Sequence, residues 1–175
     1  MKIITTRFGE LEVTPDDMLE FAEGLLGFGH LRRFVLLDDP NDDIFAWLQS
    51  CESPEIAFPV LEPELFSPLY QIDLSKTDLE ALKIASAKEA RLLTIITIPM
   101  DPTLMTANLK APIVINSKKR TARQVVLQDN ALPIREPIFA KLQQRVVQNP
   151  NAAFKTQAQD IGAVRIERRT PELEV

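Results

Sequence analysis

Thirteen prolines, spread along a chain of 175 residues, constrain what this sequence can fold into. Proline interrupts a helix because its ring removes a backbone donor and clashes with the preceding turn. The apolar runs between the prolines are short, and turn residues separate them, as residues 38–41 do after Phe34–Leu37. Short apolar runs at this spacing are typical of antiparallel barrels and sandwiches. The sequence therefore predicts a mainly β fold: a small antiparallel barrel-like domain with one or two short helices and a C-terminal helical extension.

Several segments have the apolar or alternating character of strands. In chain order they are Lys2–Phe8, Leu11–Val13, Phe34–Leu37, Phe45–Leu48, Ile56–Leu61, Leu92–Ile98, Pro112–Asn116 and Gln124–Gln128. We expect Gly9-Glu10 to form a tight turn between the first two, and Ser117–Arg123 to join the last two. The run Leu92–Ile98 is nearly continuous in hydrophobicity, which predicts a strand buried on both faces.

Helix signals are fewer. Ser75-Lys76-Thr77-Asp78 resembles a capping start for a helix over Leu79–Ile84. Glu136–Gln148 carries apolar residues at four-residue spacing, which predicts an amphipathic helix docked on the core. Beyond Pro150, residues 151–160 could extend a helix or be loose, residues 161–166 could pair as an edge strand, and residues 168–171 are expected to form a tail. The predicted division is a β domain over 1–139 and a helix-and-tail extension over 140–175.

The composition limits the chemistry. With one histidine, His30, and one cysteine, Cys51, we expect no zinc site and no intrachain disulfide. Five glycines cannot supply a Walker loop or a dinucleotide fingerprint, so no cofactor is expected. Ser50-Cys51 has no evident base beside it, and a hydrolase using some pair of the many carboxylates remains an alternative. The apolar runs are too short to span a bilayer, and the N-terminus does not resemble a secretory signal, so we expect a cytoplasmic protein without membrane contact.

Charge is distributed unevenly along the chain. Residues 1–90 contain 7 Lys/Arg and 18 Asp/Glu, whereas residues 91–175 contain 13 and 7. Eight acids and no base lie between Asp38 and Glu64, and these are Asp38, Asp39, Asp42, Asp43, Glu52, Glu55, Glu62 and Glu64. Such a segment can attract a basic partner by speeding encounter, or can simply be a solubilising surface.

A basic patch lies on the expected hairpin of the second half, at Lys118, Lys119, Arg120 and Arg123. Phosphate binding requires such a patch, so an RNA-binding β-barrel using Lys118–Arg123 is the alternative function. No aromatic residue that could stack on bases lies nearby, and the net charge of the chain is −5. A solvated hairpin loop is the simpler interpretation of this patch.

Four motifs occur in a particular order: Phe8-Gly9-Glu10, Gly24–Phe28, Trp47–Ser50 followed by Ala57-Phe58, and Thr106–Asn116. Together they resemble the FliW family of flagellar assembly factors over roughly residues 1–139. Leu26 stands where the family often has proline, Gly29 stands where an acid is common, and the chain continues past the usual end of the family.

The resemblance implies a β-barrel-like fold and a non-enzymatic cytoplasmic protein. It also implies two alternative protein partners, flagellin and the translational repressor CsrA, with no direct contact to nucleic acid. CsrA must carry a basic surface to bind RNA, so we expect the acids to meet it, namely Asp38, Asp39, Asp42, Asp43, Glu62 and Glu64. Flagellin ends are amphipathic helices that need an exposed apolar surface, for which Phe28, Phe45 and Phe66 are candidates, with core positions as the alternative.

Overall fold

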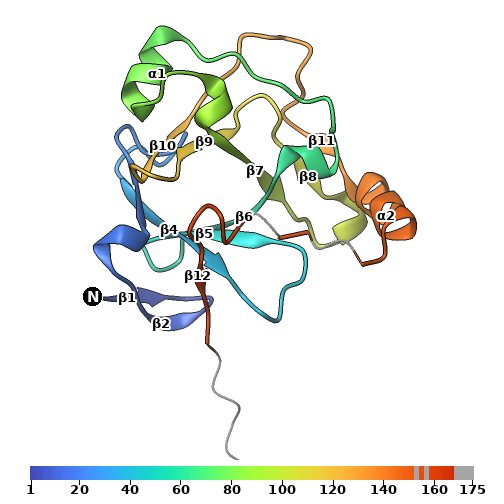
Figure 1. Cartoon of the computed structure of the whole chain (residues 1–175). Helices are drawn as coiled ribbons and strands as arrows, with labels where there is room; N and C mark the ends of the chain where they lie inside the picture. Colours follow the sequence, from blue (N-terminus) through green and yellow to red (C-terminus); the bar gives the residue numbers. More distant parts are fainter. Residues whose placement is uncertain (152–153, 156–157, 168–175) are drawn as a thin grey trace, which may run out of the picture.

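The computed structural model describes residues 1–151, 154–155 and 158–167. Its centre is a closed barrel of seven strands (Figure 1). These are β3 (Met18–Phe21), β4 (Arg33–Asp38), β5 (Ala46–Ser50), β6 (Ala57–Leu61), β7 (Arg91–Thr97), β9 (Ile113–Asn116) and β10 (Thr121–Gln124). The neighbouring strands are antiparallel, except that β10 closes the barrel by pairing parallel to β3, with Thr121 opposite Glu20. The predicted mainly β, antiparallel barrel is confirmed.

Smaller elements cover the outside of the barrel. β1 (Lys2–Thr5) and β2 (Gly9–Glu12) form a separate hairpin, while β8 (Thr106–Ala107) and β11 (Glu136–Pro137) extend the sheet beyond β7. Two α-helices, α1 (Lys76–Leu82) and α2 (Phe139–Gln148), lie on different sides of the barrel (Figure 1). Four short 3-10 turns complete the described part, at Pro15–Asp17, Pro63–Leu65, Ala87–Glu89 and Pro102–Leu104. The last strand, β12 (Val164–Arg165), pairs parallel to β4.

The core has two main layers, because alternate strand residues point to opposite faces of the sheet. The first, which we call the lumen cluster, fills the barrel with residues from all seven strands. Its strand members are Leu19, Phe21, Phe34, Leu36, Ala46, Leu48, Val60, Leu93, Ile113, Ile115 and Ala122. The second, the outer cluster, packs strand residues such as Leu37 and Trp47 against α2 and the β1–β2 hairpin. A small third cluster lies beneath α1 around Leu82.

The predicted strands are present, with differences at two turns. The tight turn expected at Gly9-Glu10 is wrong: Gly9 already pairs with Thr5 inside the hairpin, and the chain turns before it. The strand expected over Gln124–Gln128 instead begins at Thr121 and ends at Gln124. Beyond its end, Val125 and Leu127 still donate backbone hydrogen bonds to Pro112 and Lys110, so the ladder continues with alternate bonds.

Both predicted helices are present with different bounds: α1 begins three residues before the expected Leu79 and ends two residues before Ile84, and α2 is shorter than predicted. Ser75 caps α1 and accepts a hydrogen bond from the Asp78 amide at 3.1 Å, while the Asp78 carboxylate accepts from the Ser75 amide in return. α2 begins at Phe139 rather than Glu136, because Glu136 and Pro137 pair with β8. The edge strand expected within residues 161–166 is present as β12. Residues 151 and 158–160 form turns and residue 154 a bend, and the expected tail at 168–171 lies outside the described residues. The division at residue 139 stays a prediction.

Candidate functional site

The acid-rich segment begins with Asp38, at the end of β4, and this carboxylate already has partners within the chain. The Lys155 Nζ lies 2.6 Å from its Oδ1, and the Gln159 amide nitrogen lies 3.1 Å from its Oδ2. Burial opposes ionisation of Asp38, but the hydrogen bonds from Lys155 and Gln159 outweigh it and lower the pKa below its ordinary value. A partner that uses Asp38 must therefore replace these contacts.

Asp39 and Asp42 organise the loop that follows. Asp39 is buried, and its Oδ1 accepts the Asn41 amide at 3.0 Å. The Asp42 carboxylate accepts three hydrogen bonds, from the Ile44 and Phe45 amides and from the Trp47 indole nitrogen at 2.9 Å. Both residues therefore stabilise local backbone structure, as aspartates commonly do in turns.

Asp43 differs from its neighbours because its side chain is exposed, at the rim of a hollow of about 610 Å³. Trp47 forms part of this hollow, and the Arg7 guanidinium lies 3.9 Å above the centre of its ring. Phe8 meets the same ring edge-on, with 6.0 Å between ring centres. The arrangement fixes the aromatic side chains in place and leaves a charged rim toward solvent.

Glu62 and Glu64 form a second acidic group near the end of β6. Glu62 is only 9% exposed, and burial together with the neighbouring Glu64 raises its pKa to about 7. Arg91 partly offsets this effect, and Arg91 itself lies 4.0 Å from Asp160. Glu64 is exposed. Of the six predicted acids, Asp43 and Glu64 are thus the exposed ones, although Glu64 shares a hydrogen bond with Glu62, and the other four are buried or hydrogen-bonded within the fold.

The three aromatic candidates are also placed unequally. Phe28 is half-buried in a loop at one end of the lumen cluster, where it packs edge-on against Phe58 with 5.5 Å between ring centres. Phe45 and Phe66 are buried in the outer cluster, at 8% and 3% exposed. Their burial leaves them little surface to offer a partner. Both residues lie beside turn residues in the sequence, and this position does not indicate whether a side chain is buried in one of the core clusters.

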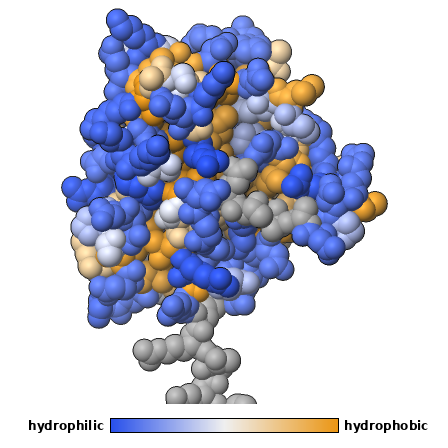
Figure 2. Space-filling model, viewed as in Figure 1, coloured by the Kyte–Doolittle hydropathy of each residue, from blue (hydrophilic) through white to orange (hydrophobic). Residues whose placement is uncertain are grey.

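Other apolar side chains are exposed instead, and the sequence pattern did not identify them. The five most exposed among the described residues are Met100, Leu69, Val147, Ile4 and Leu104, at 103%, 92%, 79%, 69% and 65%. Three of them, Leu69, Met100 and Leu104, lie within two residues of a proline. An apolar residue close to a proline was therefore the sequence signal that could have predicted their exposure. Figure 2 shows mostly hydrophilic residues on the visible face, with smaller orange areas between them and one at the outer end of α2.

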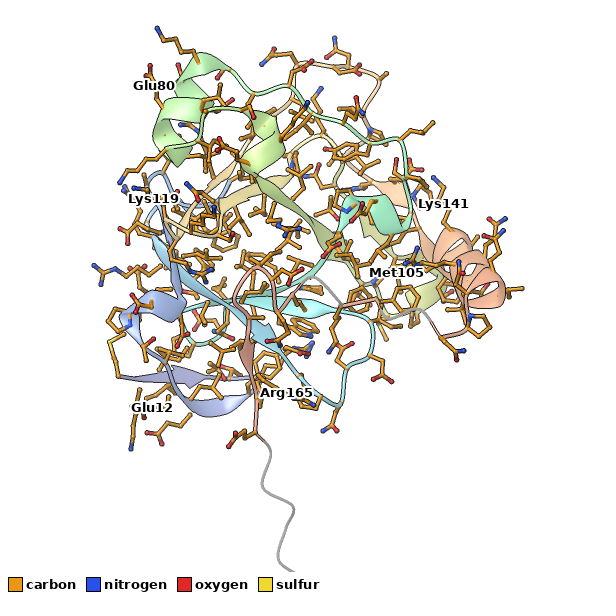
Figure 3. The ribbon with its side chains drawn as sticks, viewed as in Figure 1. Glu12, Glu80, Met105, Lys119, Lys141 and Arg165 are labelled. Carbon is orange, nitrogen blue, oxygen red and sulfur yellow. The ribbon has the colours of Figure 1, made fainter. Side chains whose placement is uncertain are left out.

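The basic residues of the β9–β10 hairpin do not form one open patch. Arg120 points inward, and its guanidinium donates to the Ile161 carbonyl and, at 3.0 Å, to the Asp17 carbonyl. Arg123 lies 3.1 Å from Glu23 and 3.3 Å from Asp78. Lys118 and Lys119 are exposed, and Figure 3 shows Lys119 at the hairpin, far from Lys141 on α2 and from Arg165 on β12. Of the four basic residues considered for RNA binding, Lys118 and Lys119 are thus the exposed ones.

Two features of the described residues bear on reactive chemistry. Burial raises the pKa of the Cys51 thiol to about 11, so it stays protonated at neutral pH and is a poor nucleophile. Among residues 1–151, 154–155 and 158–167, no group of three His, Cys, Asp or Glu side chains is placed to hold a metal ion.

Within these same ranges, every helix is too short or too polar to cross a bilayer.

Comparison with known proteins gives a consistent result. The family model described as FliW protein matches residues 2–138. The flagellar assembly factor FliW of Bdellovibrio bacteriovorus is 67% identical over 161 residues, which is 92% of both chains. That of Syntrophus aciditrophicus is 43% identical over 139 residues, 79% of this chain and 88% of the relative. A crystal structure of the flagellar assembly factor FliW superposes with a TM-score of 0.74 at 36% identity, covering 79% of this chain and 97% of that one.

Proposed function

This chain belongs to the FliW family of flagellar assembly factors, and from this premise we propose that it binds flagellin and, as an alternative partner, the repressor CsrA. Binding to CsrA would release flagellin messages for translation. The protein acts by docking rather than by catalysis, and it acts in the cytoplasm, where both partners are made.

The observation that carries this proposal is the acid-rich segment of the chain between Asp38 and Glu64. Eight acids without a base lie between Asp38 and Glu64, and Asp43 and Glu64 are exposed. A surface of this sign attracts a partner whose own surface is basic because it binds RNA phosphates. The poor nucleophile at Cys51 supports a role in binding rather than in covalent chemistry.

The direct test is titration of the purified protein with flagellin and with CsrA in a calorimeter. We expect a binding heat with each, and we expect flagellin to displace CsrA when it is added to the preformed complex. The absence of heat with both partners would disprove the proposal. Simultaneous binding of both would disprove the part that makes them alternatives.

A second test concerns the acids. The double variant Asp43→Asn/Glu64→Gln removes two exposed negative charges, so association with CsrA should slow and depend less on salt. The variant Glu12→Gln/Glu80→Gln removes the same charge from two other exposed positions, which lie at opposite ends of the molecule in Figure 3. Stopped-flow rates at several salt concentrations compare the two. An equal slowing in both variants would mean that net charge, not this surface, steers the encounter.

A further inference from the structure

The described C-terminal residues form a strap across one end of the barrel. We use the name C-terminal strap for Phe154, Lys155 and residues 158–166, which end in β12 and are red in Figure 1. β12 pairs with β4 at Leu37 and Asp38, beyond the point where β3 stops pairing with the same strand. The strap lies outside the residues that match the family model, so it is an addition to the common barrel.

Apolar side chains of the strap close the barrel lumen. Ala158 and Ile161 are 5% and 1% exposed, and both belong to the lumen cluster. Phe154 is half-buried and packs against the outer cluster, and together with Ala158 it lines a gap beside Leu36, Ala46, Val60 and Leu93 of the barrel. The gap that remains beneath them is only about 10 Å³. Phe154, Ala158 and Ile161 are spaced four and three residues apart in the sequence.

Polar groups hold the strap at the rim. Lys155 donates to the Asp38 carboxylate at 2.6 Å and to the Asp39 carbonyl at 2.9 Å, and its side chain is 14% exposed. Gln159, four residues later in the sequence, donates to the other oxygen of Asp38 at 3.1 Å. The strap therefore combines an apolar face toward the lumen with a lysine paired to an acid of the rim.

We infer that this end of the barrel is a docking site for an amphipathic protein segment, and that the C-terminal strap occupies it within the same chain. The strap itself indicates which segments the site accepts. Such a segment has apolar residues at sequence positions i, i+4 and i+7 and a lysine directly after the first of them, as Phe154, Lys155, Ala158 and Ile161 do. The acid-rich surroundings of Asp38 favour a basic residue at that position. The inference rests on the proposed function in one respect, namely that the competing segment belongs to a protein client.

Occupation within the chain has a quantitative consequence. A client can bind only the fraction of molecules in which the strap has left the site, and its apparent affinity falls by that fraction. A change that weakens the strap about tenfold should therefore tighten client binding by up to about tenfold. The strap would then set the concentration at which a client is recognised.

The test uses the full chain with Lys155→Ala, which removes the contact to Asp38 but leaves the barrel residues unchanged. The probe is a fluorescent synthetic peptide with the sequence of residues 150–167. We expect its anisotropy titration to show about tenfold tighter binding to the variant than to the unchanged protein. Lys118→Ala removes the same charge from an exposed position in the β9–β10 hairpin and should bind the peptide as the unchanged protein does.

Two further arms make the test specific. Gln159→Ala weakens the same rim contact more gently and should give an intermediate gain, which keeps the test valid if Lys155→Ala folds poorly. A peptide whose own lysine is replaced by alanine should bind the Lys155→Ala protein several-fold more weakly, because Asp38 then lacks its partner. Equal peptide affinity in the Lys155→Ala, Gln159→Ala and Lys118→Ala proteins would overturn the inference.

Flagellin added to the same proteins separates this inference from the proposed function. Tighter flagellin binding to Lys155→Ala than to Lys118→Ala supports both. Peptide binding that strengthens while flagellin shows no binding to any of the proteins would contradict the proposed function and leave the docking site supported. Peptide binding that never strengthens, with normal flagellin binding, would overturn the docking site alone.

Discussion

Among single residues, Asp42 shows how an acid that looks available for a partner is used inside the fold. Its carboxylate receives two backbone amides and the indole of Trp47, so its charge is partly neutralised by donors of its own loop. Asp43, the next residue, is exposed. Of these two adjacent acids, Asp42 therefore stabilises the loop and Asp43 is exposed at the surface.

We predict that Asp42→Ala lowers the free energy of unfolding by about 2 kcal/mol, because three donors lose an ionised acceptor. Asp43→Ala should change it by less than about 0.5 kcal/mol. Urea denaturation followed by the fluorescence of Trp47, the only tryptophan, measures both variants. Equal losses in the two variants would show that the hydrogen bonds of Asp42 contribute nothing measurable.

Glu62 predicts a dependence of stability on pH. Its pKa of about 7 in the folded protein lies above the ordinary value of 4.5, so the folded state binds its proton more tightly than the unfolded state does. The stabilisation that this proton gives is complete below about pH 4.5 and is lost as the pH rises through about 7. Glu62→Gln cannot ionise, so relative to the unchanged protein it should gain roughly 1–3 kcal/mol between about pH 5 and pH 8.

Urea denaturation at a series of pH values checks this expectation. Glu55→Gln serves as the control, because hydrogen bonding to Ser53 lowers the pKa of Glu55 and keeps it ionised over this range. The three charged groups that act on Glu62 are Glu64, Arg91 and Asp160, and none of them is changed in either variant. A difference from the unchanged protein that stays constant with pH would contradict the shifted pKa of Glu62.

Among elements, the loop between β3 and β4 depends on one glycine. Gly24 has a φ of +67°, and a Cβ built on it would lie 2.6 Å from the Phe28 carbonyl oxygen. Gly27, in the same loop, also has a positive φ, +81°, but a Cβ there would meet nothing within 4 Å. Both glycines therefore need a positive φ, which glycine adopts without strain. Only at Gly24 does the backbone of other residues also lie too close for a Cβ atom.

We predict that Gly24→Ala destabilises the protein by about 3 kcal/mol or more, since it adds a backbone clash to the strain of a positive φ. Gly27→Ala should lose only about 1 kcal/mol, from the strain alone. Midpoints of urea unfolding compare them. Similar losses in the two variants would mean that the loop shifts to accept a methyl group at position 24 without cost.

Local pattern predicted most elements, and its failures have physical causes. The strands β4 to β7 were found because apolar runs ended at turn residues, and α1 was found because Ser75 and Asp78 form a capping box. The sequence pattern did not indicate that Phe45 and Phe66 are buried in the outer cluster. The barrel sheet buries apolar residues on both of its faces, so the pattern does not separate the two core clusters. It identified the acids of the candidate site but not that Asp38 is paired within the chain, since its partner Lys155 is more than 100 residues away in the sequence.

For the whole molecule, Arg120 connects three distant parts of the chain. From the β9–β10 hairpin its guanidinium reaches the Asp17 carbonyl before β3 and the Ile161 carbonyl of the C-terminal strap. Burial lowers its pKa below the ordinary value, although Asp17 and Asp16 oppose this effect. The planar guanidinium suits a site with two separate acceptors better than an ammonium group does.

We predict that Arg120→Ala lowers the free energy of unfolding by roughly 2–4 kcal/mol, because two partly buried carbonyls lose a charged donor. Arg120→Lys should recover less than half of this, since one ammonium cannot reach both acceptors in the same geometry. Lys119→Ala, beside it on the surface, should cost less than about 0.5 kcal/mol. Chemical denaturation of the three variants tests this order, and full recovery by lysine would show that charge alone matters.

The parallel pairing of β10 with β3 also has a consequence for synthesis of the protein. Glu20 and Thr121 are neighbours in the barrel but about 100 residues apart in the chain. The pairing of β3 with β10 therefore joins a strand that is synthesised early to one that is synthesised late. At about 5–20 residues per second, the ribosome exposes β3 for roughly 5–20 seconds before its partner emerges. During that interval the nascent sheet has an unpaired edge, and a cell making this protein must keep that edge from pairing with a neighbouring nascent chain.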